Sequence, residues 1–339
     1  MNKFLQTDPW CIVRDGFRSD QQLESETNFS LANGHIGQRA NFEEYYSGET
    51  EIGSYISGGY YSEKDWNELK NDADILENSK LLNAPNWTGI IVRLNDEVLD
   101  LATWEIVNFA QVLHMREGLL ERNFEVISIN GHQIQVAVKR FLSMAETEIG
   151  AITYSIKSLN FDGRISLMPI MDANIRNIQT ENNEQLWNVL QIRTQQDVSH
   201  LWAKARHVNF QFCGALSFTI YKNNEQLKVI PTKIEKERIA GFSIGADVRT
   251  GDTVCLNKYF AIIDSVKHPN EELTEYACTM ARSAKAKGWN QLFEEHTDAW
   301  ASKWIQTDPV VETDIEAQQA MHYKQFRSIQ NTESKKDAV

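Results

Sequence analysis

Hydrophobic and polar residues alternate along most of the chain between about residues 10 and 265, which is the period of β-strands. Residues 124–143, FEVISINGHQIQVAVKRFLS, are the clearest case: two alternating runs flank Asn130–Gly131, a pair that favours a tight primed turn. Two further hairpins are predicted in the same way, with turns at Asp162–Gly163 and Asn223–Asn224. Many strands joined by short turns, with no alternating helices, predict an antiparallel, mainly β fold and a large sandwich.

The period changes to a helical one after His268. Asn270 is the predicted N-cap, with two glutamates in the first turn, and Gly288 is expected to end or break this helix. Asp314 is predicted to cap a final helix. The apolar stripes expected on the three helical segments are Leu273, Tyr276, Ala277, Met280 and Ala284; then Leu292, Phe293, His296, Trp300 and Trp304; then Ile315, His322, Phe326 and Ile329.

The composition of the 339-residue chain is that of a soluble globular protein, with 42% hydrophobic residues, enough for a sizeable core. The net charge of -13 is spread along the chain and argues against nucleic acid or an anionic membrane as a partner. The first residues contain no long apolar run, so neither a signal peptide nor a membrane span is predicted. Four cysteines far apart fit free thiols in a reducing cytoplasm, and a cytoplasmic protein is expected.

Short motifs for catalysis find little support. Gly241 to Gly245, GFSIG, matches a nucleophile elbow, but that motif needs a following helix and here a turn and another strand follow. We therefore interpret Ser243 as an ordinary strand residue. Adjacent glutamates at 271–272 and 294–295 diverge on a helix and cannot flank a glycosidic bond. The histidines show no metal-ligand spacing, and no glycine-rich loop opens a helix to bind a phosphate.

Tryptophans are candidates for sugar stacking because each offers a flat apolar face and one N–H donor. The alternative is that they are core or interface residues, which is the commoner situation for any single tryptophan. The candidates by residue type are Trp66, Trp87, Trp104, Trp187 and Trp202.

One stretch near the N-terminus, ESETNFSLANGHIGQRANFEEYYSG followed by GSYISGGYY, is distinctive. It resembles the N-terminal motif of glycoside hydrolase family 65, the maltose phosphorylase group. Later segments such as REGLLERNFEV and LNFDGRISLMPIMD resemble that group in the same order, so the resemblance covers essentially the whole chain. The matching positions of the motif are Glu24-Ser25 (or Ser25-Glu26), Phe29-Ser30, Asn33-Gly34, Gly37-Gln38-Arg39 and Glu43-Glu44.

The resemblance implies a galactose-mutarotase-like supersandwich at residues 1–265, a helical linker at 266–308, and the start of an α/α barrel at 309–339. It also implies a parent enzyme that is an inverting phosphorylase. A glutamic acid in the barrel protonates the glycosidic oxygen while inorganic phosphate attacks the anomeric carbon, which turns a maltose-like α-glucose disaccharide into β-glucose 1-phosphate and glucose. Phosphate is a co-substrate, no cofactor or metal is implied, and a homodimer is expected.

The barrel residues that act in this family follow the last helix, so the resemblance assigns no catalytic residue to this chain. We expect the chain to be inactive alone. Within the motif, five polar residues are candidates for the rim of a substrate pocket in the parent enzyme, and a structural role fits them as well, since Asn-Gly makes a turn and an arginine pairs with carboxylates. These candidates are Asn33, His35, Arg39, Glu43 and Glu44.

Two other functions stay open at the level of sequence. A stand-alone carbohydrate-binding sandwich predicts measurable affinity for glucosides. The third possibility is an enzyme with a new active site inside the sandwich. It is disfavoured because none of the catalytic motifs considered above finds support in the sequence.

Overall fold

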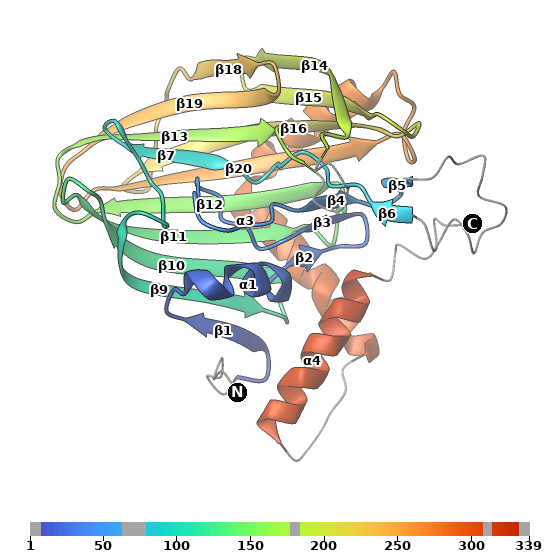
Figure 1. The fold of residues 1–339 in the computed structure, drawn as a ribbon, viewed down its shortest axis with the longest axis horizontal. Coiled ribbons are helices and arrows are strands. Elements are labelled where there is room, and N and C mark those ends of the chain that lie inside the picture. The colour runs from blue at the N-terminus through green and yellow to red at the C-terminus, as the bar shows by residue number, and fades with distance from the viewer. Residues whose placement is uncertain (1–7, 63–78, 177–183, 308–313, 332–339) are drawn as a thin grey trace.

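The computed structural model describes residues 8–62, 79–176, 184–307 and 314–331 (Figure 1). The fold is the predicted one: antiparallel sheets form a sandwich, and two helices follow it.

A ten-stranded sheet is the largest element, and all its strand pairs are antiparallel. Its strands, from one edge to the other, are β1 (Cys11–Asp15), β9 (Glu105–His114), β10 (Leu119–Ile127), β11 (Gln133–Leu142), β12 (Ile149–Ser158), β20 (Thr253–Asp264), β16 (Gln211–Lys222), β15 (Val198–Ala205) and β14 (Trp187–Gln195), with β17 (Glu225–Gln226) paired to β16.

One face of this sheet carries the other sheets, and the core lies between them. A five-stranded sheet covers the half near β14, β15 and β16: β18 (Thr232–Lys236), β19 (Ile239–Val248), β13 (Gly163–Asp172), β7 (Ile90–Leu94) and β8 (Glu97–Val98). The N-terminal segment lies over the half near β11: η1 (Ser19–Gln21), α1 (Gln22–Asn28), β2 (Leu31–Ala32), β3 (Ile36–Gln38), β4 (Ser54–Ile56), β5 (Tyr60–Ser62) and β6 (Ser79–Leu81).

The turns confirm two predicted hairpins and correct one detail. Strands β10 and β11 do pair around Asn130–Gly131, but only Gly131 has a positive φ, of 82°. Gly131 N–H donates to Ser128 O at 2.9 Å, so a longer loop ends in a left-handed glycine instead of forming a primed turn. At Asn223–Asn224 both residues have positive φ, 51° and 69°, as a primed turn requires.

The predicted hairpin at Asp162–Gly163 is wrong. Strand β12 pairs with β11 and β20, whereas β13 pairs with β7 and β19 in the other sheet. The connection between Ser158 and Gly163 therefore carries the chain from one layer of the sandwich to the other. Alternation shows that one face of each strand is buried, but it does not show which strand is the neighbour.

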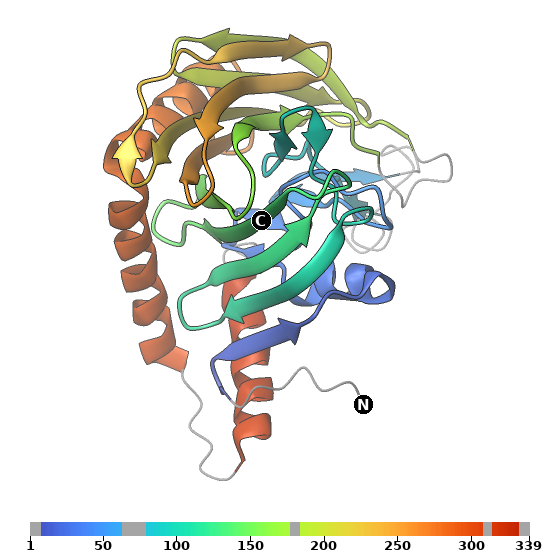
Figure 2. The same cartoon turned by 90° about the vertical axis from the view of Figure 1, so that its left-hand side faces the viewer.

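Helix α3 (Leu273–Thr307) packs on the outer face of the large sheet, along β12, β20, β16 and β15 (Figure 2). It begins later than predicted: Pro269 to Glu272 form a turn, so Asn270 is not the N-cap. Gly288 breaks the helix as predicted, with φ 75° and ψ 172°. Small buried residues on the first half, Ala277, Ala281 and Ala284, allow it to lie close to the strands.

The second half of α3 carries the predicted stripe, with His296, Trp300 and Trp304 all buried. His296 is held at both ring nitrogens, since Nδ1 accepts from Met144 N–H at 3.0 Å and Nε2 donates to Glu117 O at 2.7 Å. Burial lowers the pKa of His296 to about 4. This histidine is therefore a neutral link between the helix and the turns that follow β9 and β11.

Helix α4 (Ile315–Gln330) begins at the predicted cap, where the Asp314 side chain accepts from Glu316 N–H at 3.0 Å. His322, Phe326 and Ile329 are buried as predicted, but Ile315 is 49% exposed because it lies in the first turn, away from the sandwich. Phe326 stacks on Trp300 with 5.1 Å between ring centroids. The final helix thus packs against the sandwich and α3.

Trp87, Trp104 and Trp187 are buried core residues, Trp202 is half-buried, and Trp66 lies outside the described residues. In the described parts of the chain, every helix is too short or too polar for a membrane span.

Replacement of Gly118 tests the contact between α3 and the sheet. A Cβ at Gly118 (φ 61°) lies 2.0 Å from Trp300 Nε1, so Gly118→Ala must displace that buried ring. The matched control is Gly131→Ala, where φ is 82° but, apart from its two chain neighbours, no described residue has an atom within 4 Å of the new Cβ. Both variants carry left-handed strain, and we expect Gly118→Ala to lose a further ~1–3 kcal/mol in urea unfolding. If the two variants lose the same free energy of unfolding, the close contact between Gly118 and Trp300 is contradicted.

The pH dependence of stability tests His296. Its folded pKa of about 4 lies below the ordinary value near 6.5, so the unfolded chain binds the proton more readily. The folded state accommodates only the neutral form of His296, so its full stability is present above pH ~6.5. As the pH falls towards 4, the free energy of unfolding should decrease by roughly 3 kcal/mol.

Urea unfolding at several pH values measures this loss. We expect His296→Gln to be less stable at pH 7 but flatter between pH 6.5 and 4.5 than the wild type. His207→Gln, which changes an exposed histidine, is the control and should keep the wild-type slope. If stability depends on pH as steeply in His296→Gln as in the wild type, His296 is not the cause of that dependence.

Candidate functional site

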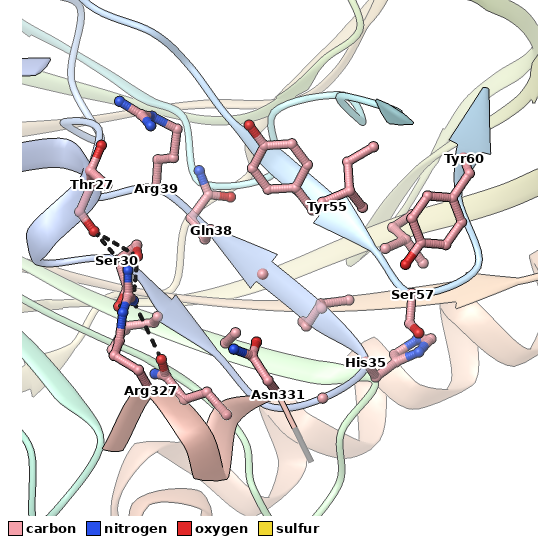
Figure 3. A pocket seen from close by; sticks show the side chains of 18 residues that line it. Thr27, Ser30, His35, Gln38, Arg39, Tyr55, Ser57, Tyr60, Arg327 and Asn331 are labelled. Atoms are coloured by element: carbon pink, nitrogen blue, oxygen red, sulfur yellow. Dashed lines mark hydrogen bonds between the residues drawn. The ribbon is translucent and has the colours of Figure 1, made fainter. Parts of the chain in front are cut away.

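The carboxyl end of α4 is held against the carboxyl end of α1 by hydrogen bonds to backbone carbonyls (Figure 3). The Arg327 guanidinium donates to Thr27 O and Ser30 O, both at 3.1 Å, and to Ser30 Oγ at 2.6 Å. Tyr323 O–H donates to Asn28 O at 3.0 Å. The last carbonyls of a helix lack partners within it and carry partial negative charge, so a cation is a favourable partner there.

A pocket of about 360 Å³ lies between this end of α4 and the small sheet β2–β3–β4. Figure 3 shows Tyr55 and Tyr60 on the side of the pocket across from Arg327 and Asn331. The side chains that line it with polar or aromatic groups are Thr27, Ser30, His35, Gln38, Arg39, Tyr55, Ser57, Tyr60, Arg327, Gln330 and Asn331.

Asn33 forms the turn that brings His35 to the pocket. Its Oδ1 accepts from the N–H groups of His35 at 3.1 Å and Ile36 at 2.9 Å, and Gly34 has φ 90°. Its Nδ2 donates to Ser143 O and Thr147 O at 2.7 and 2.9 Å. Asn33 is 1% exposed and does not line the pocket, so it fixes the turn to the large sheet.

His35 and Arg39 both line the pocket. His35 is 3% exposed, and Nε2 lies 3.4 Å from Asp264 Oδ2; burial lowers the pKa of this histidine. Arg39 donates to the backbone of Glu51 and Leu23, and its guanidinium lies 3.4 Å from the Glu51 carboxylate and 3.7 Å from that of Glu26. The positive charge of Arg39 is therefore offset by two acids.

Glu43 and Glu44 lie inside the protein and do not line the pocket. Glu44 binds the Arg122 guanidinium through both carboxylate oxygens and accepts from Tyr154 O–H at 3.1 Å. Glu43 binds Arg122 at 2.8 Å and Arg140 at 2.9 Å. The two adjacent glutamates thus join the N-terminal segment to β10, β11 and β12. That these five residues form the rim of a substrate pocket in the parent enzyme stays a prediction. Of the five, only His35 and Arg39 line the pocket beside α4.

The charges in this cluster are compensated within it. Burial alone raises the pKa of Glu43, but the guanidinium groups of Arg140 and Arg122 outweigh burial and hold this pKa below its ordinary value. Burial raises the pKa of Tyr154 well above its ordinary value, and the carboxylate of Glu44 raises it further. Glu43 is therefore ionised at neutral pH, whereas Tyr154 stays protonated and donates to Glu44.

Arg122, Arg140 and Lys258 belong to no single motif, although the sequence carries a signal for each. All three occupy inward positions of the alternating pattern, between hydrophobic neighbours two residues away on either side. The Lys258 side chain is fully buried, and its Nζ donates to Gly89 O at 2.9 Å and Ile170 O at 2.7 Å. A charged residue at an inward strand position requires a buried partner, and that requirement could have flagged the cluster.

Other candidate chemistry finds no assembled site in the described parts of the chain. Ser243 lies within β19, and the next element is strand β20, as predicted from its sequence. Among the described residues, no three or more histidine, cysteine or acidic side chains are placed to bind a metal ion. Burial raises the pKa of Cys11 to about 12, which keeps this thiol protonated at neutral pH.

Comparison with known proteins gives a consistent result. The family model described as the glycosyl hydrolase family 65 N-terminal domain matches residues 12–303. A maltose phosphorylase of Bacillus subtilis (strain 168) is 29% identical over an alignment of 334 positions, and the match covers 96% of this chain and 42% of that protein. An α,α-trehalose phosphorylase of Thermoanaerobacter brockii is 24% identical over 95% of this chain and 43% of its own length.

A solved structure of a putative kojibiose phosphorylase from human microbiome superimposes with a TM-score of 0.83 at 23% identity. The superposition covers 96% of this chain and 42% of that one, and it shows the shared fold. The chain therefore spans less than half the length of these relatives.

Removal of one charge tests the buried cluster. We expect Glu44→Gln to lower the free energy of unfolding by ~3–5 kcal/mol, because breaking a buried ion pair leaves Arg122 partly uncompensated. The control is Asp247→Asn, which breaks the ion pair between Asp247 and Arg164. This pair lies at the surface, since the Arg164 side chain is 55% exposed and the Asp247 side chain is 82% exposed. That change should cost less than ~1 kcal/mol. Urea unfolding of both variants measures the difference, and similar losses contradict a structural role for Glu44.

Proposed function

The chain belongs to glycosyl hydrolase family 65, and from this we propose that it is the N-terminal structural domain of an inverting α-glucoside phosphorylase. The observation that carries the proposal is the coverage: 96% of this chain matches 42% of a maltose phosphorylase. The parent reaction is phosphorolysis of a maltose-like disaccharide to β-glucose 1-phosphate and glucose. The role of this domain is to support a catalytic barrel, to form part of the rim of its pocket, and to offer a homodimer surface.

The packing of α4 supports a structural role for the sandwich beside a separate catalytic barrel. Residues 1–265 form the sandwich domain, 266–308 the helical linker, and 309–339 the start of the barrel. The two helices are fixed to the sandwich through Trp300, Phe326 and Arg327, so the sandwich sets the direction in which a barrel begins. We propose a cytoplasmic protein without cofactor or metal, and with the disaccharide and phosphate as the partners of the parent enzyme.

A stand-alone carbohydrate-binding module is the second candidate. The pocket beside α4 favours it, because polar and aromatic side chains line a cavity of about 360 Å³ within this chain.

Phosphorolysis assays test the first proposal. The 339-residue chain, incubated with phosphate and maltose, trehalose or kojibiose, should release no glucose 1-phosphate. The product of the same reading frame extended beyond Val339 should release it from one of these sugars. Glucose 1-phosphate from the 339-residue chain, or a stop codon directly after Val339, overturns the proposal.

A further inference from the structure

We propose that the pocket between β2–β3–β4 and the carboxyl end of α4 binds one ring of a neutral saccharide. The inference deepens the proposed function and rests on it for the choice of an α-glucoside as the ligand. It assigns a sugar site to residues of this chain, apart from any site in a barrel.

The aromatic side of the pocket suits a sugar ring. Tyr55 is half-buried, and Tyr60 is 37% exposed at the edge of the two-stranded sheet β5–β6. Figure 3 shows both rings across from the polar end of α4. A tyrosine ring offers a flat apolar face to the C–H groups of a sugar and a hydroxyl to its oxygens.

The charges around the pocket favour a neutral ligand over an ion. Glu26 and Glu51 offset the charge of Arg39, and Arg327 directs its donors to the carbonyls of α1. In the described chain no aspartate or glutamate lines the pocket, which disfavours a cation. The remaining groups are amides, hydroxyls and a histidine, a mixture of donors and acceptors that matches sugar hydroxyls.

Among the described residues, three side chains that line the pocket have buried nitrogen atoms without a hydrogen-bond partner: His35 Nδ1, Gln38 Nε2 and Gln330 Nε2. Their residues are 3%, 1% and 2% exposed, respectively. An unpaired buried polar group costs free energy, and a hydroxyl bound beside it supplies a partner after a small side-chain rotation. The volume of about 360 Å³ lies at the lower end of the range of ligand pockets, roughly 300–1,000 Å³, which fits a single ring.

Saturation-transfer NMR and calorimetry on the 339-residue chain test the site, with glucose, maltose, trehalose, kojibiose and inorganic phosphate as probes. We expect transfer to the protons of at least one sugar and a Kd on the order of 1 mM, since a small open site recovers little free energy beyond the cost of association. Tyr60→Ala should weaken that Kd roughly 3- to 10-fold. The matched control is Tyr45→Ala, which removes a ring that is 53% exposed and does not line the pocket.

The outcomes separate this inference from the proposed function. No transfer to any sugar, or equal weakening by Tyr45→Ala and Tyr60→Ala, overturns the sugar site. Tighter binding of phosphate with displacement of the sugar overturns the choice of a neutral ligand. Phosphorolysis by the extended protein without sugar binding by this chain overturns the sugar site alone. Sugar binding without any phosphorolysis by the extended protein supports the site and overturns the proposed function.

Discussion

The buried ion pairs between Glu43, Glu44, Arg122 and Arg140 are the interaction on which the rest of the structure depends. They tie the irregular N-terminal segment to the large sheet, whereas no described strand of that segment (β2 to β6) pairs with a strand of the large sheet. Buried charges of this kind add little net stability compared with apolar residues, but losing one partner is costly. We infer that the cluster selects one position for the segment, because a displaced segment leaves charges unpaired in the core.

The position of the N-terminal segment determines where the pocket beside α4 forms. Once Glu43 and Glu44 are fixed, Asn33 reaches the carbonyls of Ser143 and Thr147 and holds the turn before His35. The same segment presents the end of α1 to Arg327, which anchors α4. The two walls of the pocket therefore come from parts of the chain separated by nearly three hundred residues, and one network of hydrogen bonds and ion pairs positions both.

This arrangement suits a domain that supports another. The large sheet carries the core on one face and α3 on the other, and α4 is fixed by contacts to backbone carbonyls and by the stack of Phe326 on Trp300. Contacts to backbone carbonyls depend little on which side chains are present, so they can hold the helix while the pocket beside it varies.

The sequence by itself determined the strand-rich sandwich, the hairpins at Asn130 and Asn223, the break at Gly288 and the cap at Asp314, because each depends on local periodicity or on the backbone preference of one or two residues. Tertiary structure alone decided which strands are neighbours outside those two hairpins, as the crossing at Asp162–Gly163 shows. It also turned Glu43 and Glu44 inward, since their partners Arg122 and Arg140 lie about eighty to a hundred residues away. Local sequence records that a position is buried, whereas the identity of its partner is a property of the folded chain.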